Sequence, residues 1–403
     1  MISGPIGRNR PNGEPTPFRQ FILKMHSRCN LACTYCYLYT MADQRWRHRP
    51  PVMSARIAEL SAARIAEHVR SHGLADIAVV LHGGEPLLAG PDRLRHVVEA
   101  VRGAVGDTAA VGFSLQSNGT LLDRGFLPLF DELGIRVGVS LDGAATAQDR
   151  HRRRATGGSH AQVTRGLAEL TRPEFRHLFS GLLCVIDLGN DPVATYEALL
   201  AFSPPAIDLL LPHANWSNPP AGPAGAYASW LIPIFDRWFH APERETRIRL
   251  FEEIINVLLG GSSAVEGIGT SPAAMIVVET DGQIEQSDIL AATFEGAAHL
   301  GLDVVNDDFD AALRHPATIA RQLGTTGIPG ECRACRWATI CAGGHYSHRY
   351  QDQKGFDHRS VYCADLFALF DHIRTALVDE LAVRAAAASA PSALHDPALT
   401  VIP

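Results

Sequence analysis

Short apolar runs alternate with longer amphipathic stretches along the first half of the chain. The apolar runs predict six strands, at residues 21–25, 77–82, 112–117, 135–141, 178–186 and 207–211. Between most of these runs the apolar positions recur every three to four residues, which predicts helices over residues 54–70, 93–102 and 160–170. Strands that alternate with helices form parallel sheets, so the pattern predicts an α/β fold built on a partial (β/α)6 barrel of the TIM type.

The rest of the pattern divides the chain into five parts. Residues 1–17 are rich in Pro and Gly and predict an arm without a core of its own, and residues 18–215 hold the barrel. A Pro/Gly-rich stretch at 219–223 ends the alternation, so connecting helices are expected over 216–261. A small C-terminal domain is expected over 262–380, and the tail at 381–403 is predicted to be either a loose helix or disordered.

Composition limits the kind of protein. Hydrophobic residues make up 46% of the 403 residues and charged residues 20%, which is typical of a globular chain with room for two domains. No apolar run approaches the roughly 18 residues that span a bilayer, and the first residues do not resemble a secretory signal, so we expect a soluble, cytoplasmic protein without a membrane partner. The net charge of −7 argues against nucleic acid as a partner.

Three cysteines follow the first predicted strand with the spacing C-x3-C-x2-C: Cys29, Cys33 and Cys36. They supply three thiolates and leave a fourth position open, as in a 4Fe-4S cluster with one iron free to bind a ligand. The alternatives are a structural zinc site or chance. Zinc sites usually combine C-x2-C pairs and close all four positions, and no fourth ligand lies nearby in the sequence. The spacing therefore favours radical chemistry at an iron–sulfur cluster.

Polar residues also follow later predicted strands. After the second strand comes the run Gly83-Gly84-Glu85, in which the glycines let the backbone approach a ligand and the carboxylate can accept hydrogen bonds from a ligand ammonium. Taken alone, this run could be a plain strand-to-helix turn. Further candidates are Ser117, Asn118, Ser140 and Arg152, for which loop caps or solvated charges are the alternatives.

Together with the aromatic residues Tyr35 and Tyr37 on either side of Cys36, these motifs resemble the radical S-adenosylmethionine (SAM) superfamily. The resemblance implies that the cysteine loop holds a SAM-binding 4Fe-4S cluster and that Tyr35 lies in the cofactor site. It implies that the run Gly83-Gly84-Glu85 contacts the methionine amino group of SAM. It also places four polar side chains near the ribose and carboxylate of SAM: Ser117, Asn118, Ser140 and Arg152.

A second group of cysteines lies near the C-terminus: Cys332, Cys335, Cys341 and Cys363. Four thiolates can close either an iron–sulfur cluster or a structural zinc site, and spacing alone favours neither. The group resembles the SPASM extension of radical SAM peptide-modifying enzymes, which implies an auxiliary 4Fe-4S cluster. A full SPASM domain carries a second auxiliary cluster, one of whose cysteines would fall at His345, and residues 278–289 contain no cysteine. The resemblance therefore implies two 4Fe-4S clusters, one held by three cysteines and one by four.

Longer runs at residues 18–26, 41–46, 278–286 and 348–363 are similar to the cyclophane-forming radical SAM/SPASM maturases, which act on Phe-x-Ser motifs of ribosomally made peptides. The resemblance implies a precursor peptide as partner and an electron donor such as flavodoxin or ferredoxin. It also implies a carbon–carbon bond between an aromatic ring and the β-carbon of the residue two positions on. Asp288 and Glu279, with Asp281, are candidates for the base that removes the ring proton, and turn or surface roles are the alternative.

Other outcomes of the same radical step are thioether formation, epimerisation and sulfatase-type oxidation of Ser or Cys. Sulfatase-maturing enzymes are expected to carry two auxiliary clusters, so His345 argues against that reaction. A non-catalytic iron–sulfur or peptide-binding protein belongs to a different class. Such a protein has no need of an open iron, so the intact cysteine triplet disfavours it.

Overall fold

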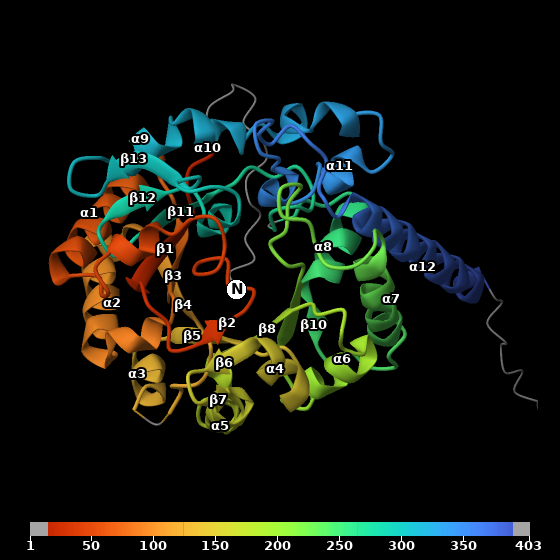
Figure 1. The fold of residues 1–403 in the computed structure, drawn as a ribbon, viewed down its shortest axis with the longest axis horizontal. Coiled ribbons are helices and arrows are strands. Elements are labelled where there is room, and N and C mark those ends of the chain that lie inside the picture. The colour runs from red at the N-terminus through yellow and green to blue at the C-terminus, as the bar shows by residue number, and fades with distance from the viewer. Residues whose placement is uncertain (1–14, 124, 264, 390–403) are drawn as a thin grey trace, which may run out of the picture.

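A sheet of ten strands curves around the centre of the computed structural model, which describes residues 15–123, 125–263 and 265–389 (Figure 1). The bounds of its strands are β1 (Gln20–His26), β3 (Asp76–Gly83), β4 (Ala110–Ser117), β5 (Ile135–Ser140), β8 (Phe179–Val185), β9 (Ala206–Leu210), β10 (Arg247–Ile248), β11 (Met275–Val278), β12 (Gln283–Glu285) and β13 (His299–Asp303). They lie in the order β10-β9-β8-β5-β4-β3-β1-β11-β12-β13, and every pair from β10 to β11 is parallel. The predicted α/β class is confirmed, and the six predicted strands are found as β1, β3, β4, β5, β8 and β9.

Helices cover the outer face of this sheet (Figure 1). The three predicted helices are found as α1 (Ala55–His72), α2 (Pro91–Val105) and α5 (His160–Leu170). The other helices are α3 (Leu127–Glu132), α4 (Ala145–His151), α6 (Pro192–Leu200), α7 (Ala226–Phe239), α8 (Arg249–Leu258), α9 (Phe309–Leu313), α10 (Pro316–Ala320), α11 (Ala338–Cys341) and α12 (Cys363–Ser389). No helix within the described ranges is long and apolar enough to cross a membrane.

Alternation along the strands decides what faces the barrel interior. On β3, Ile77, Val79 and Leu81 lie in the hydrophobic core, so the residues between them point to the other side of the sheet. The parallel register of β1 and β3 pairs Lys24 with His82 near the carboxyl ends of both strands. Because carboxyl ends of parallel strands meet at one edge, polar side chains from distant segments gather there.

A second, small sheet lies in front of this edge (Figure 1). It consists of β2 (Ala32–Cys33), β6 (Arg152–Arg154) and β7 (Gly157–Gly158), in the order β2-β6-β7. The antiparallel register pairs Cys33 with Arg152 and Ala32 with Arg153. The first cysteine motif is therefore attached directly to the arginine run.

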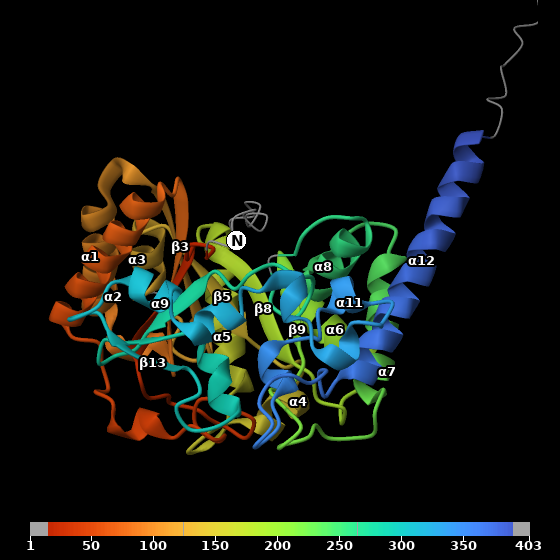
Figure 2. The same ribbon diagram turned by 90° about the horizontal axis from the view of Figure 1, so that it is seen from above.

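The segment expected as a C-terminal domain contributes strands to the main sheet. β11 pairs in parallel with β1, with Gln20 opposite Met275, and β12 and β13 extend the sheet beyond it. The chain then forms short helices and ends in α12, which packs on α7 and α8 and continues past residue 380. Figure 2 shows the last part of α12 projecting from the body. Residues 1–14 of the predicted arm and 390–403 of the predicted tail lie outside the described residues.

Candidate active site

The cysteines of the first motif lie on the loop that follows β1. Cys29 Sγ accepts hydrogen bonds from Leu31 N at 3.4 Å and from Asn118 Nδ2 at 3.6 Å. Burial raises the pKa of Cys29 to about 11 and also raises the pKa values of Cys33 and Cys36. The charge of Cys33 adds to the raised pKa of Cys29, that of Cys36 to the pKa of Cys33, and that of Cys29 to the pKa of Cys36. Three adjacent sulfur donors on one loop fit a 4Fe-4S cluster.

Gly83 and Gly84 are required by the backbone that packs against them. A Cβ atom on Gly83 would collide with the carbonyl oxygen of His26, and one on Gly84 would collide with that of Arg28. The amide of Gly84 donates to His26 O at 2.8 Å, and that of Glu85 donates to Arg28 O at 3.0 Å. The glycines therefore let the turn after β3 fix the start of the cysteine loop.

Glu85 is fully buried and joins this turn to the end of β4. Its carboxylate accepts hydrogen bonds from Ser117 Oγ at 2.9 Å, Asn118 N at 2.7 Å and Leu87 N at 3.1 Å. Burial raises the pKa of Glu85 to about 7 despite these bonds. Its bond to the Asn118 amide positions Asn118 beside Cys29. Because 0% of Glu85 is exposed, a contact between its carboxylate and a ligand ammonium stays a prediction.

Arg152 forms a second group, beside Cys33. Its Nη1 donates to Tyr35 Oη at 2.9 Å, and that hydroxyl donates to the buried carboxylate of Asp142. Asp142 also accepts a hydrogen bond from Val185 N at 3.0 Å. The buried Nε of Arg152 has no hydrogen-bond partner among the described residues. An unpaired guanidinium N–H in this position suits the carboxylate of a bound ligand.

Ser140, the remaining predicted SAM contact, ends β5, and its hydroxyl accepts a hydrogen bond from Gln116 Nε2 at 3.1 Å. The structure thus brings the predicted residues together in two groups. One group joins Glu85 to Ser117 and Asn118 next to Cys29, and the other joins Arg152 to Tyr35 next to Cys33.

A buried ion pair lies inside the barrel. Lys24 is 2% exposed, and its ammonium contacts the carboxylate of Asp288 and lies 3.0 Å from His82 Nδ1. Tyr37 Oη donates to the same Asp288 oxygen at 3.0 Å. Burial alone would raise the pKa of Asp288, but Lys24 and His82, with the hydrogen bonds from Lys24 and Tyr37, hold it well below its usual range. Asp288 is therefore ionised and binds protons weakly.

Glu279, the second predicted base, has the opposite character. It forms an ion pair with Arg49 at 2.9 Å, and Arg49 also pairs with Glu285. Burial, followed by the charge of Glu285, raises the pKa of Glu279 to about 7. Glu279 lines a cavity of about 20 Å³, large enough for a water molecule, together with Lys24, Gly83, Gly84 and others.

Asp281 lies at the turn between β11 and β12. Its carboxylate accepts a hydrogen bond from Gln283 N at 3.1 Å and lies 3.7 Å from Arg49 Nε. These contacts are those of a turn residue.

The second cysteine group is assembled from three helical elements. Cys332 ends the 3-10 helix Gly330–Cys332, Cys341 ends α11, and Cys363 begins α12. Burial, followed by the charge of Cys363, raises the pKa of Cys332 to about 11 and that of Cys341 to about 12. Burial also raises the pKa of Cys363, and the neighbouring charge of Cys335 adds to it. Four adjacent sulfur donors fit a closed cluster or zinc site.

His345 lies beside an ion pair. Arg321 Nη2 contacts Glu266 Oε2 at 2.6 Å, and His345 Nε2 lies 3.9 Å from the same oxygen. Burial would raise the pKa of Glu266, but Arg321 and His345 lower it to about 2. The position that a cysteine would hold in a full SPASM domain is thus part of a charged, hydrogen-bonded group.

The sequence gave no warning of a histidine cluster next to the cysteine loop. The rings of His213, His345 and His348 lie 4.9 to 6.1 Å apart, and Tyr37 packs edge-on against His213 at 4.8 Å. Burial lowers the pKa of His213 to about 4 and also lowers those of His345 and His348. His213 lies 132 residues before His345, so the cluster cannot be recognised from a local sequence pattern. The HxxH spacing of His345 and His348 is the one sequence signal that could have indicated it.

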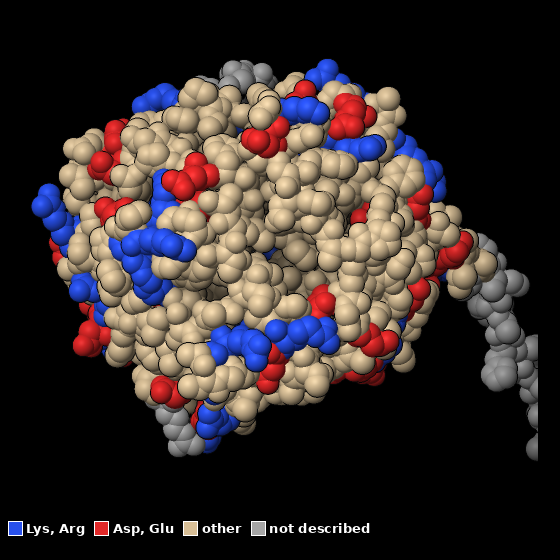
Figure 3. Space-filling view, viewed as in Figure 1, with Lys and Arg blue, Asp and Glu red and all other residues tan. Residues whose placement is uncertain are grey.

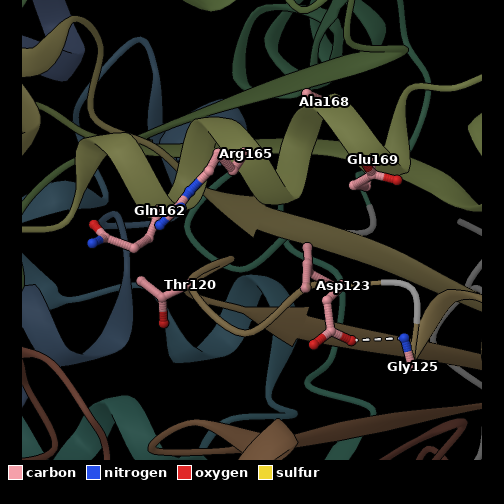
Figure 4. A pocket seen from close by; sticks show the side chains of 8 residues that line it. Thr120, Asp123, Gly125, Gln162, Arg165, Ala168 and Glu169 are labelled. Carbon is pink, nitrogen blue, oxygen red and sulfur yellow. Dashed lines mark hydrogen bonds between the residues drawn. The ribbon is translucent and has the colours of Figure 1, made fainter.

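A surface pocket of about 580 Å³ lies between the loop after β4 and α5 (Figure 4). Its charged side chains are Asp123, Arg165 and Glu169, and Asp123 accepts a hydrogen bond from Gly125 N at 2.8 Å. None of the predicted site residues lines it. The candidate active site is therefore the carboxyl edge of the barrel and not this pocket.

The chain is similar to known proteins in both sequence and fold. Residues 23–197 match the model of the Radical SAM superfamily. The chain is 23% identical over 374 residues to a cysteine-type anaerobic sulfatase-maturating enzyme of Clostridium perfringens, covering 90% of this chain and 98% of that one. It is 25% identical over 352 residues to a serine-type anaerobic sulfatase-maturating enzyme of Klebsiella aerogenes, covering 83% and 81%.

Solved structures show the same fold. The structure described as native anSMEcpe with bound AdoMet and Cp18Cys peptide has a TM-score of 0.76 and 22% identity, covering 91% of this chain and 99% of that one. Streptococcus suis SuiB bound to S-adenosylmethionine has a TM-score of 0.55 and 12% identity, covering 85% and 76%.

Residues 23–197 thus form a radical SAM domain. Along most of its length the chain is similar to anaerobic sulfatase-maturating enzymes, which indicates that it is an enzyme. The predicted enzyme class and the predicted cofactors, SAM and 4Fe-4S clusters, are confirmed. The roles of individual residues stay predictions.

Proposed function

We propose that this enzyme modifies a ribosomally made precursor peptide by joining an aromatic ring carbon to the β-carbon of the residue two positions on. The observation that carries the proposal is the charged group at His345. Glu266 and Arg321 occupy the surroundings where a second auxiliary cluster would need thiols, so the chain has sulfur donors for one auxiliary cluster. This agrees with the resemblance to cyclophane-forming maturases.

In this proposal Cys29, Cys33 and Cys36 hold the SAM-binding cluster, and Cys332, Cys335, Cys341 and Cys363 hold the auxiliary cluster. When bound, the first cluster and SAM supply a 5'-deoxyadenosyl radical that removes a hydrogen atom from the peptide β-carbon. The unpaired Nε of Arg152 binds the SAM carboxylate, with Tyr35 and Asp142 fixing the guanidinium.

Closing the ring requires the loss of a ring proton and of one electron. The auxiliary cluster, when bound, would accept the electron, and Glu279 is the better of the two predicted bases for the proton. Its pKa of about 7 is close to the value at which a general base works best at neutral pH. Asp288 has a strongly lowered pKa and is held by Lys24, so it accepts protons poorly. We assign Asp288 the role of fixing Lys24 and Tyr37 beside the substrate.

A second candidate is sulfatase-type oxidation of Ser or Cys to an aldehyde, which is favoured by the named activity of the relatives that span most of the chain. The histidine at position 345 argues against it. The partner in both cases is a peptide, as in the relative whose structure contains the Cp18Cys peptide.

The test is anaerobic reconstitution with an aromatic-x-Ser peptide. A crosslinked product is two hydrogens lighter and gives no backbone fragments inside the three-residue ring. Deuterium placed at the reacting β-carbon appears in 5'-deoxyadenosine. Because oxidation of serine to an aldehyde also removes two hydrogens, the product is treated with a hydrazide, and a trapped aldehyde would favour the second candidate. A product of unchanged mass with solvent deuterium at the α-carbon would mean epimerisation.

A further inference from the structure

The surface beside Cys33 carries an exposed arginine. Ala32 and Thr34, on either side of Cys33, are both exposed, so only small uncharged residues cover the loop at this point. The antiparallel pairing with β6 places Arg153 directly opposite Ala32. Arg152 points inward and is buried, so strand alternation turns Arg153 outward into solvent.

Arg150 continues this surface, whereas Arg154 lies on the same face of β6 as Arg152. Arg150, at the end of α4, is 43% exposed and pairs with Asp187, while Arg154 is half-buried and donates to Gly158 O at 2.9 Å. Arg153 forms no ion pair with any carboxylate of the described residues. Figure 3 shows a band of Lys and Arg side chains on this face, in the region where Figure 1 places β2 and β6. We call Arg150 and Arg153 the arginine rim.

A basic rim is unusual on this chain, whose net charge is −7. Overall charge of that sign repels acidic proteins, so a local patch of the opposite sign directs such a partner to one place. The reaction proposed above begins with one electron delivered to the cluster of Cys29, Cys33 and Cys36. Electron transfer slows steeply with distance, so the partner that delivers the electron must approach where the cover is thinnest.

We propose that the arginine rim and the surface of β2 dock an acidic one-electron carrier of the flavodoxin class. The carrier gives up one electron, and the cluster on the cysteine loop gains it. Rim charges act mainly on the rate and salt dependence of docking. This inference rests on the proposed radical SAM function but not on the identity of the peptide product.

The test measures binding of a purified flavodoxin to the reconstituted enzyme by calorimetry, at low and high salt. Arg153→Glu is expected to raise the Kd about 3- to 10-fold at low salt, with the effect shrinking at high salt because exposed charges are screened. Arg153→Lys keeps the charge and is expected to bind as the wild type does. The matched control is Arg314→Glu, which makes the same change at a side chain that is 67% exposed after α9.

Formation of 5'-deoxyadenosine without peptide provides the second readout, so failure of the crosslinking proposal does not affect it. Arg153→Glu is expected to slow the reaction driven by flavodoxin and to leave the reaction driven by dithionite unchanged. Equal loss with both reductants, or unchanged flavodoxin affinity, would overturn the proposal. Weaker peptide binding with normal flavodoxin binding would also overturn it and assign the rim to the peptide. If the reversal lowers iron content, Arg153→Gln provides the same comparison.

Discussion

Replacing Lys24 with Met should reveal how much the buried ion pair matters. Met fills nearly the same space but removes the ammonium, leaving the Asp288 carboxylate buried with a hydrogen bond from Tyr37 and with His82, whose pKa is lowered by burial. Breaking a buried pair by removing one partner costs about 3 to 5 kcal/mol because the remaining charge is uncompensated. We expect Lys24→Met to lose that much free energy of unfolding at pH 8.

The loss should depend on pH with a definite sign. Without Lys24, burial raises the pKa of Asp288 above its value in the unfolded chain, so the folded variant binds more protons than the unfolded one. Stability relative to the wild type therefore falls as the pH rises, and the deficit is smaller at pH 5 than at pH 8. Lys24→Met combined with Asp288→Asn should recover most of the loss, since no buried charge remains.

Urea unfolding of the iron-free chains, followed by circular dichroism at both pH values, measures these differences. Lys354→Met is the matched control, because it makes the same exchange on an exposed turn and should change stability by less than about 0.5 kcal/mol. The reasoning is wrong if Lys24→Met is as stable as the wild type at pH 8. It is also wrong if the double variant is no more stable than the single one.

Three further predictions concern the site. Replacing Cys29, Cys33 and Cys36 with Ala should lower iron from about eight per chain to about four and abolish SAM cleavage, and iron near twelve would contradict the single auxiliary cluster. Glu85→Gln should weaken SAM binding by about 1.5 to 3 kcal/mol with iron content unchanged. Unchanged affinity for SAM would exclude a contact between Glu85 and the ligand, and its hydrogen bonds to Ser117, Asn118 and Leu87 would be its role. The crosslinking rate should rise with pH around 7, since a base must be deprotonated. Glu279→Gln should lower that rate about 10²- to 10⁴-fold and remove this rise, whereas a retained rise would exclude Glu279.

Local chemistry explains which features the sequence could predict. Six strands and both cysteine groups could be predicted because apolar runs and ligand spacings involve residues that are close together in the sequence. The Lys24–Asp288 pair was not, because packing joins two residues that lie 264 positions apart. Glu85 shows the limit in a different way. Its motif was recognised from the sequence, but its carboxylate accepts hydrogen bonds from Ser117 and Asn118. These bonds form because the turn after β3 packs against the end of β4, which the sequence does not show.

The attachment of residues 275–278 to the barrel was hidden for the same reason. Nothing in the run 275–278 distinguishes a strand that extends the barrel from one that begins a separate unit. Only its parallel pairing with β1 shows the connection. The arginine rim likewise became visible only when β6 was found beside β2.

The pairing of β1 with β11 also constrains how the protein is made. β1 leads into the cysteine loop, and one of its two neighbours in the sheet is β11. Gln20 therefore cannot pair on that side until Met275 has been synthesised. At ribosomal rates of about 5 to 20 residues per second, β1 remains an unpaired edge on one side for tens of seconds. An open edge can pair with other chains. Expression of residues 18–215 alone would make that exposed edge permanent, so the radical SAM portion should aggregate when it is cut from the rest.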